Sequence, residues 1–272
     1  MITKGTGFPV IVIPGIQGRW EWMAPTIDAL QAGHRVISAS LQEIRPRFEA
    51  DDSLLSWMRE FDKVIDTSCE KKVSLIGVSY GGLIAACYAA RRPDRVTSLI
   101  MVSTPSPKWV PRPGDEFCLR HPILALPYFG VRALSRLLPE IYQARHTWPR
   151  RARVLLDHAG RGIRAPFSPA YAAQWIREWQ AYDISEDCQQ ITAPTLLITG
   201  DERLDQVVPV ERTREYLQLI PGATHTVLPG TGHIGLVTKP ERFAEIAGQF
   251  IYAANTAERR APQTEIRARH AS

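Results

Sequence analysis

One serine of this sequence lies in a pattern that is typical of a catalytic nucleophile. Residues 77–82 read Gly-Val-Ser-Tyr-Gly-Gly. The serine directly follows the apolar run 72–78 and precedes a segment with helical periodicity. A serine on such a sharp turn from strand to helix projects its hydroxyl above the sheet. Gly77 and Gly81 lack side chains at the positions where strand and helix pass closely. The pattern predicts Ser79 as a nucleophile; the alternative is a glycine-rich turn that matches by chance.

A serine hydroxyl needs a base, and that base needs a carboxylate to orient it. Of the seven histidines, His225 and His233 lie between the strand-like run 195–199 and the charged tail that begins at residue 255. His233 stands in the glycine-rich loop 229–235, between a strand-like run and the closing helix, and ligands meet open parallel sheets at such loops. His225 falls at the start of the last strand, where a structural role is expected. We therefore predict His233 as the base.

Two aspartates are candidates for the orienting acid. Both Asp201 and Asp205 follow the strand-like run 195–199. Asp201 is nearer to the end of the strand and could simply bracket the turn. Asp205 stands two residues before the start of the Val-Val-Pro that leads into the next helix. The pattern by itself leaves both open.

The elements that must position these residues alternate along the chain between buried strands and helices. Expected strands cover residues 8–14, 35–40, 72–78, 96–103, 195–199 and 224–228. Expected helices cover residues 23–32, 51–67, 80–92, 210–219 and 240–254. Continuous apolar strands separated by helices indicate a parallel sheet with helices on both faces.

Two segments break this alternation. About ninety residues, 105–193, are rich in Pro, Arg and aromatic side chains and contain no strand-like run. We interpret them as a helical insertion that forms a cap between a first core segment, residues 1–104, and a second, residues 194–254. Residues 255–272 have few apolar side chains and many charges, so we expect a disordered tail.

From residue 8 to about residue 254 the chain resembles the α/β-hydrolase superfamily. The elbow at 77–81, the Gly232-His233 loop and Asp205-Gln206-Val207-Val208-Pro209 carry the resemblance. The last of these is similar to the acid loop of many members, although two extra residues separate Asp205 from Gly200. The resemblance favours Asp205 over Asp201. It also implies hydrolysis on a Ser79–His233–Asp205 triad, with no metal or other cofactor.

The chain departs from that family in two places. Members commonly have His-Gly after the first central strand, whereas this chain has Pro14-Gly15. An oxyanion hole needs backbone donors, which we assign to the N–H groups of Ile16 and Tyr80. Too few residues precede residue 8 for the family's first hairpin of two strands. We therefore expect about six mostly parallel strands, with strand 35–40 at an edge that residues 41–50 shield.

Composition limits the remaining classes of function. The 272 residues carry a net charge of +5 without a recognised nucleic-acid module, so the basic side chains indicate a solvated surface. No apolar run approaches the roughly 20 residues that span a bilayer. The four cysteines are scattered, and no export signal opens the chain, so we expect a cytoplasmic protein without membrane insertion.

The leading hypothesis is a serine hydrolase that cleaves a carboxylic ester or related acyl bond of a small molecule. An acyltransferase or C–C bond hydrolase on the same triad is the alternative, and a non-catalytic ligand-binding member of the fold is a third. Trp20 and Trp22, just after the oxyanion loop, are candidates for contact with the substrate. Aromatic residues of the insertion, such as Trp148, Trp175 and Trp179, either line the pocket or form the insertion's own core. We expect a monomer, or a weak homodimer joined through the cap.

Overall fold

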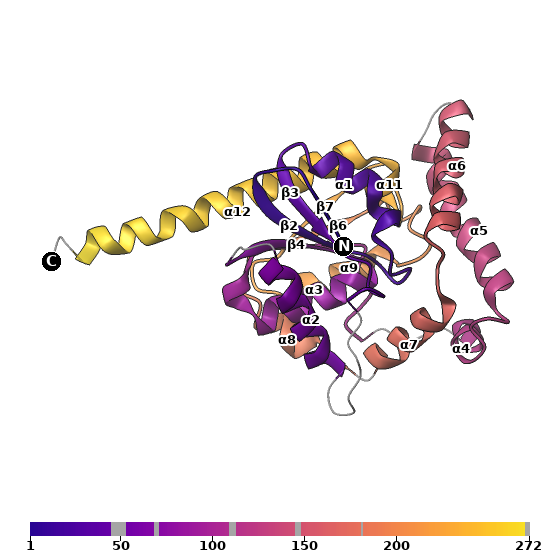
Figure 1. The fold of residues 1–272 in the computed structure, drawn as a ribbon, viewed down its shortest axis with the longest axis horizontal. Coiled ribbons are helices and arrows are strands. Elements are labelled where there is room, and N and C mark those ends of the chain that lie inside the picture. Colours follow the sequence, from indigo (N-terminus) through magenta and orange to yellow (C-terminus); the bar gives the residue numbers. More distant parts are fainter. Residues whose placement is uncertain (45–52, 68–70, 109–112, 145–147, 181, 270–272) are drawn as a thin grey trace.

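The computed structural model describes residues 1–44, 53–67, 71–108, 113–144, 148–180 and 182–269 (Figure 1). A seven-stranded sheet forms the centre, in the order β1-β3-β2-β4-β5-β6-β7. All neighbouring strands are parallel except β1 and β3. The strands are β1 (Ile2–Lys4), β2 (Phe8–Ile13), β3 (His34–Ser38), β4 (Val73–Val78), β5 (Val96–Val102), β6 (Thr195–Thr199) and β7 (Thr224–Val227).

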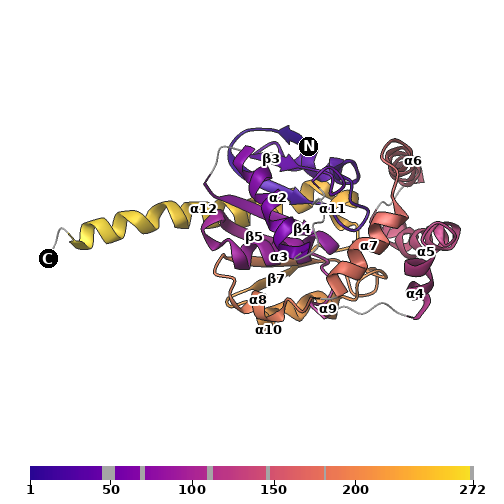
Figure 2. The same ribbon diagram turned by 60° about the horizontal axis from the view of Figure 1, so that its bottom comes forward.

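The central strands are apolar along their whole length because helices cover both faces of the sheet. Every residue of β4 and β5 is buried. One face is covered by a short 3-10 helix and three α-helices: η1 (Trp20–Met23), α1 (Ala24–Leu30), α11 (Gly235–Thr238) and α12 (Pro240–Arg269). Elements on the other face are α2 (Ser53–Thr67), α3 (Tyr80–Arg91), α8 (Ser185–Gln189), α9 (Val210–Arg214) and α10 (Tyr216–Leu219), with η2 (Pro93–Arg95) leading into β5. Figure 2 shows these layers from a second direction. The predicted architecture, a mostly parallel sheet with helices on both faces, is confirmed.

The N-terminus adds one strand to the six that we expected. β1 pairs antiparallel with β3, with Ile2 opposite Ser38 and Lys4 opposite Val36. Seven residues are too few for a hairpin but suffice for one short strand, because Gly5 and Gly7 adopt positive φ angles of 75° and 106° and turn the chain sharply. β3 is therefore not an open edge. We expected residues 41–50 to shield the edge of strand 35–40. Of these, residues 45–50 lie outside the described residues.

Between β5 and β6 the described residues form helices and loops and contain no strand. We call the following four the insertion helices: α4 (Pro113–Arg120), α5 (Leu126–Ala144), α6 (Trp148–Arg164) and α7 (Pro169–Gln180). They lie together at the end of the molecule opposite the C-terminus (Figures 1 and 2). In the part of the chain that the structure describes, no helix is long and apolar enough to cross a bilayer.

The C-terminal segment differs from our expectation of disorder. α12 continues through residues 255–269 and projects away from the sheet (Figure 1). Its first turns beyond residue 254 are tied to the core, since Lys72 forms an ion pair with Glu258 at 2.6 Å. The guanidinium of Arg259 also lies over the ring of Phe8, 4.7 Å from its centroid. These contacts hold the helix as far as Arg259, a reach that low hydrophobicity alone did not indicate.

Candidate active site

Ser79 occupies a strained turn between β4 and α3. Its backbone angles are φ 52° and ψ −119°, which a residue with a side chain rarely adopts. Its N–H donates a hydrogen bond to the carbonyl of Val102 on β5 at 2.7 Å, and its carbonyl accepts one from Gly82 N–H at 2.9 Å. The neighbouring strand and the first turn of α3 thus hold the serine in this conformation.

Two glycines permit the turn by allowing backbone to approach backbone. A Cβ on Gly77 would lie 2.5 Å from the carbonyl oxygen of Gly81. A Cβ on Gly81 would lie 2.5 Å from the carbonyl oxygens of Ile13 and Pro14, at the end of β2. No side chain fits at either position, which is the physical reason for the spacing seen in the sequence.

His233 lies between Ser79 and Asp205. Its Nε2 atom is 3.1 Å from the Oγ atom of Ser79. Its Nδ1 atom is 3.3 Å from each of the two carboxylate oxygens of Asp205. Both side chains are largely shielded from water, with 13% of His233 and 1% of Asp205 exposed. The three predicted residues, from loops after β4, β6 and β7, therefore form one continuous chain of contacts.

The carboxylate of Asp205 is held by the backbone that follows it. One of its oxygens accepts hydrogen bonds from the N–H groups of Val207 at 3.1 Å and Val208 at 2.9 Å. Burial raises the pKa of Asp205, but the charge of His233 and its hydrogen bond outweigh it, with help from Val208 N–H. The net pKa lies below its usual value, so the carboxylate is ionised at neutral pH.

The pKa of His233 is shifted in the opposite direction. Burial lowers it, whereas the charge of Asp205, the hydrogen bond to it and the more distant charge of Glu140 raise it, and the net pKa lies above its ordinary value. An imidazole in this environment can accept a proton from a hydroxyl and hold it while negative charge develops on the substrate oxygen. The geometry and the electrostatics suit proton transfer from Ser79.

The two alternative residues have other contacts. Asp201 accepts a hydrogen bond from Gly230 N–H at 2.7 Å, and its own N–H donates to the carbonyl of Thr231 at 2.8 Å. It therefore ties the loop after β6 to the loop after β7. His225, on β7, lies with its Nε2 atom 2.9 Å from the Thr199 hydroxyl. Neither side chain has a described contact with His233 or Ser79.

The two predicted oxyanion donors belong to segments next to the serine, the turn after β2 and the start of α3. Ile16 belongs to the turn after β2, which is closed by a hydrogen bond from Gly18 N–H to the carbonyl of Gly15 at 2.8 Å. A Cβ on Gly15 would be 3.4 Å from the Cβ of Ser79, so this turn packs against the nucleophile. Tyr80 is the first residue of α3, where N–H groups have no partner within the helix.

Trp20 and Trp22 lie in η1, directly after that turn. The indole N–H of Trp22 donates a hydrogen bond to the carbonyl of Ala165 at 2.9 Å. Its ring meets the imidazole of His158 edge-on, with centroids 4.8 Å apart. Trp22 thus contacts α6 and the residue that follows it. Both Trp20 and Trp22 also pack against the apolar core cluster that includes residues of α1 and α12.

The insertion's aromatic residues do not share one role. Trp175 and Trp179, on α7, are buried in the core cluster that includes Tyr80. The hydroxyl of Tyr80 donates a hydrogen bond to the carbonyl of Trp175 at 3.3 Å. Trp148 is exposed at the start of α6.

A residue that sequence reasoning missed is Glu140, which lies on α5 and is completely buried. One carboxylate oxygen accepts a hydrogen bond from Ile234 N–H at 2.9 Å, and the other accepts one from the Thr238 hydroxyl at 3.0 Å. Burial raises the pKa of Glu140, partly offset by these donors and by the charge of His233. The Pro-Glu pair within a helical, arginine-rich segment gave no signal that one acid would be buried beside the histidine loop.

Comparison with known proteins places this arrangement in a family. The model of the alpha/beta hydrolase family matches residues 10–246. The chain belongs to the alpha/beta hydrolase family.

Other alpha/beta hydrolases are similar to most of its length. A protein named as the carbamate hydrolase RutD in Caulobacter sp. (strain K31) is 27% identical over 86% of this chain and 87% of its own. The 2-hydroxy-6-oxo-6-(2'-aminophenyl)hexa-2,4-dienoic acid hydrolase of Metapseudomonas resinovorans is 26% identical over 92% and 86%. The structure of an esterase from Exiguobacterium antarcticum superposes with a TM-score of 0.71 at 21% identity, covering 92% of this chain and 94% of that one. This alpha/beta hydrolase is an enzyme of the hydrolase class.

Proposed function

We propose that this alpha/beta hydrolase is a serine hydrolase that cleaves a carboxylic ester or a related acyl bond through an acyl-enzyme. The observation that carries the proposal is the line of contacts from Ser79 Oγ to His233 Nε2 at 3.1 Å and from His233 Nδ1 to Asp205 at 3.3 Å. A serine, a base and an ionised acid in this order form the minimal set for acyl transfer to a hydroxyl.

In the proposed reaction, the Ser79 oxygen attacks the acyl carbon while His233 Nε2 takes the hydroxyl proton. The tetrahedral oxyanion accepts hydrogen bonds from the N–H groups of Ile16 and Tyr80. When it collapses, the bond to the leaving alcohol breaks and His233 donates the proton to that oxygen. Water, deprotonated by His233, then attacks the acyl carbon of the acyl-enzyme. When this second intermediate collapses, the bond to the Ser79 oxygen breaks, His233 returns the proton to that oxygen, and the acid is released. Asp205 stabilises the imidazolium in both halves of the cycle.

We further propose that the insertion helices form a cap over this site. Three of them contact residues next to the chemistry: α5 through Glu140 and Ile234, α6 through His158 and Trp22, and α7 through Trp175 and Tyr80. A substrate that reaches Ser79 passes between these helices and the oxyanion turn. In this arrangement Trp20 and Trp22 border the acyl group.

A fluorophosphonate probe tests the proposal, because only an activated serine is labelled. We expect labelling of the native enzyme and none of Ser79→Ala, and hydrolysis of p-nitrophenyl esters by Ser79→Ala at least about 100-fold below native. Ser135→Ala, an exposed serine on α5, is the matched control and should behave as native. Labelling of Ser79→Ala at the native rate would contradict the proposal.

Hydrolysis of a C–C bond on the same residues is a second candidate, favoured by the similarity to the hexadienoic acid hydrolase. Ester and vinylogous keto-acid substrates offered in parallel discriminate between the two. We expect a larger kcat/KM for an ester of optimal chain length, and the reverse order would favour C–C cleavage.

A further inference from the structure

Helix α5 carries an apolar stripe on the side that faces away from the core. Its positions recur every three or four residues, so they lie on one face of the helix. They are Val131, Leu134, Leu138 and Tyr142, and between 42% and 69% of each is exposed. The opposite face of the same helix carries the buried Glu140 and its contacts to the histidine loop. An amphipathic helix normally buries its apolar stripe, but here the apolar side chains face water.

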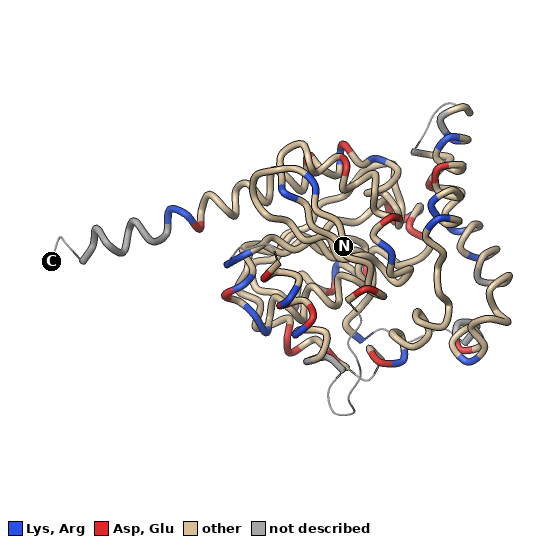
Figure 3. Tube along the Cα trace, in the orientation of Figure 1, with Lys and Arg blue, Asp and Glu red and all other residues tan. Residues whose placement is uncertain are grey.

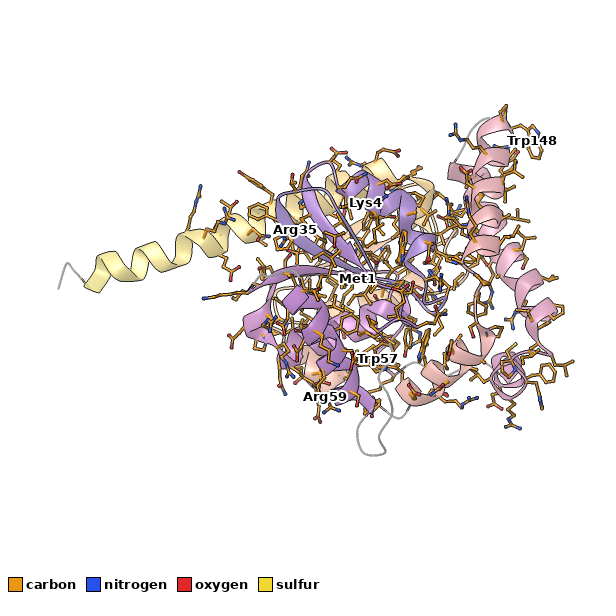
Figure 4. The ribbon with its side chains drawn as sticks, viewed as in Figure 1. Met1, Lys4, Arg35, Trp57, Arg59 and Trp148 are labelled. Carbon is orange, nitrogen blue, oxygen red and sulfur yellow. The ribbon has the colours of Figure 1, made fainter. Side chains whose placement is uncertain are left out.

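Helix α6 repeats this arrangement. Its exposed face carries Trp148, Leu156 and Ile163, of which 71% to 82% is accessible, with Ala159 between them. Figure 4 shows Trp148 pointing away from the molecule at the beginning of the helix. A different face of α6 carries His158, which packs against Trp22. Each helix thus exposes an apolar stripe. The two helices lie at the same end of the molecule (Figure 2).

Arginines accompany both stripes. Of the arginines on the two helices whose side chains are described, Arg132, Arg151, Arg153 and Arg164 accompany the stripes, whereas the charges of Arg136 and Arg161 act on His233 and His158. Among the described residues of the same helices the acids are Asp157 and the buried Glu140. The guanidinium of Arg151 on α6 lies 3.6 Å from the centroid of the Tyr142 ring on α5, so a charge lies directly against an aromatic ring of the stripe. Figure 3 shows the basic positions along the two helices.

We propose that the outward faces of α5 and α6 dock this enzyme onto an anionic lipid surface. Helices that lie in a membrane interface combine a stripe of Trp and Leu with arginines at its border, because the apolar side chains enter the acyl region while the cations meet lipid phosphates. The arginines favour an anionic lipid surface over a second copy of the chain as the partner of this face. Pairing two identical faces would bring both sets of arginines together, and like charges repel each other.

The proposal rests on the proposed function and deepens it. Docked in this way, the insertion helices lie between the lipid and the Ser79 site, with α5 touching the bilayer on one face and the His233 loop on the other. The substrate class that suits this position is an acyl ester carried in or at a lipid surface, rather than one free in water.

Flotation of the full-length chain with vesicles tests the docking separately from catalysis. The vesicles contain phosphatidylcholine alone, or phosphatidylcholine with 30 mol% phosphatidylglycerol. We expect the native chain and Ser79→Ala to float with the anionic vesicles, and raised salt to weaken the binding. A triple variant, Leu134→Ser, Leu156→Ser and Ile163→Ser, should bind at least about tenfold more weakly. Arg153→Gln with Arg164→Gln should lose the preference for anionic lipid.

Matched controls lie outside the insertion: Tyr252→Ser for the apolar variant and Arg242→Gln for the charge variant, both exposed on α12. The triple variant should keep native hydrolysis of a water-soluble ester and a native Tm, so a loss of binding cannot be unfolding. Failure of the native chain to float, or equal binding to neutral vesicles, would overturn docking and leave the proposed hydrolysis intact. A stable dimer in light scattering that the triple variant abolishes would assign the face to a second copy.

Discussion

The carboxylate of Glu140, on an insertion helix, accepts a hydrogen bond from the backbone N–H of Ile234, the residue that follows the histidine, at 2.9 Å. The insertion therefore touches the loop that presents His233, not merely the rim of the site. The charge of Glu140 also raises the pKa of His233. A displacement of α5 would move the loop and change the electrostatics of the base together.

We expect Glu140→Gln to shift the acid limb of the kcat/KM profile to lower pH. A base must be neutral to act, and losing the Glu140 charge lowers the pKa of His233. Gln is nearly isosteric: its oxygen can accept from Ile234 N–H, and its amide can donate to the Thr238 hydroxyl. Activity against pH for a p-nitrophenyl ester checks this. Glu140→Ala should reduce kcat more strongly, because it leaves buried donors unpaired. An unmoved acid limb in Glu140→Gln would show that its charge does not reach the base.

Asp205→Asn should lower kcat by about three orders of magnitude or more, because an amide cannot stabilise the imidazolium. Asp201→Asn should cost less than about tenfold, since Asn can still accept the hydrogen bond from Gly230 N–H. The two variants make the same change four positions apart on one loop, so each is the other's control. Steady-state kinetics that reversed this order would transfer the role of acid to Asp201.

The sequence predicted what is encoded locally. The elbow could be located because a Cβ atom at residue 77 or 81 would lie 2.5 Å from backbone oxygens, so both positions require glycine. That requirement is visible in the sequence itself. The strands of the sheet could be located because they are buried on both faces and therefore apolar without interruption. The roles of Ser79, His233 and Asp205 stay predictions, although the structure brings the three side chains into contact.

Contacts between segments that are far apart in the sequence could not be predicted from sequence patterns alone. Glu140 meets Ile234 across 94 residues, and a lone acid in an arginine-rich helix looks like a solvated side chain. β1 was missed because three residues are too short to show a period. The extension of α12 was missed because Lys72 and Phe8, which hold Glu258 and Arg259, are remote in the sequence.

His158 should make the fold less stable in acid. Burial, with the charge of Arg161, lowers its pKa from the ordinary 6.5 to about 4. As pH falls below 6.5 the unfolded chain takes up this proton while the folded chain does not, so stability is lost between about pH 6.5 and 4. Between pH 7 and 5 we expect the free energy of unfolding of His158→Phe to fall by about 2 kcal/mol less than that of the native protein, measured by urea unfolding. The difference between the two proteins is used because His34 and His225 also have lowered pKa values. Equal losses in both would show that His158 is protonated in the folded chain.

Gly77→Ala and Gly130→Ala should change stability in opposite directions. The methyl group at 77 would lie 2.5 Å from the Gly81 carbonyl oxygen and 2.6 Å from the Gly82 Cα atom, and backbone on both sides cannot yield. We expect a loss of about 3 kcal/mol, together with loss of hydrolysis as the Ser79 turn moves. Gly130 lies within α5 with nothing within 4 Å of an added Cβ, so alanine there should stabilise the helix by up to about 1 kcal/mol. Urea unfolding followed by tryptophan fluorescence measures both changes. If Gly77→Ala kept native stability and native turnover, the elbow would tolerate a wider approach of strand and helix than these contacts require, and the strain assigned to Ser79 would have no functional consequence.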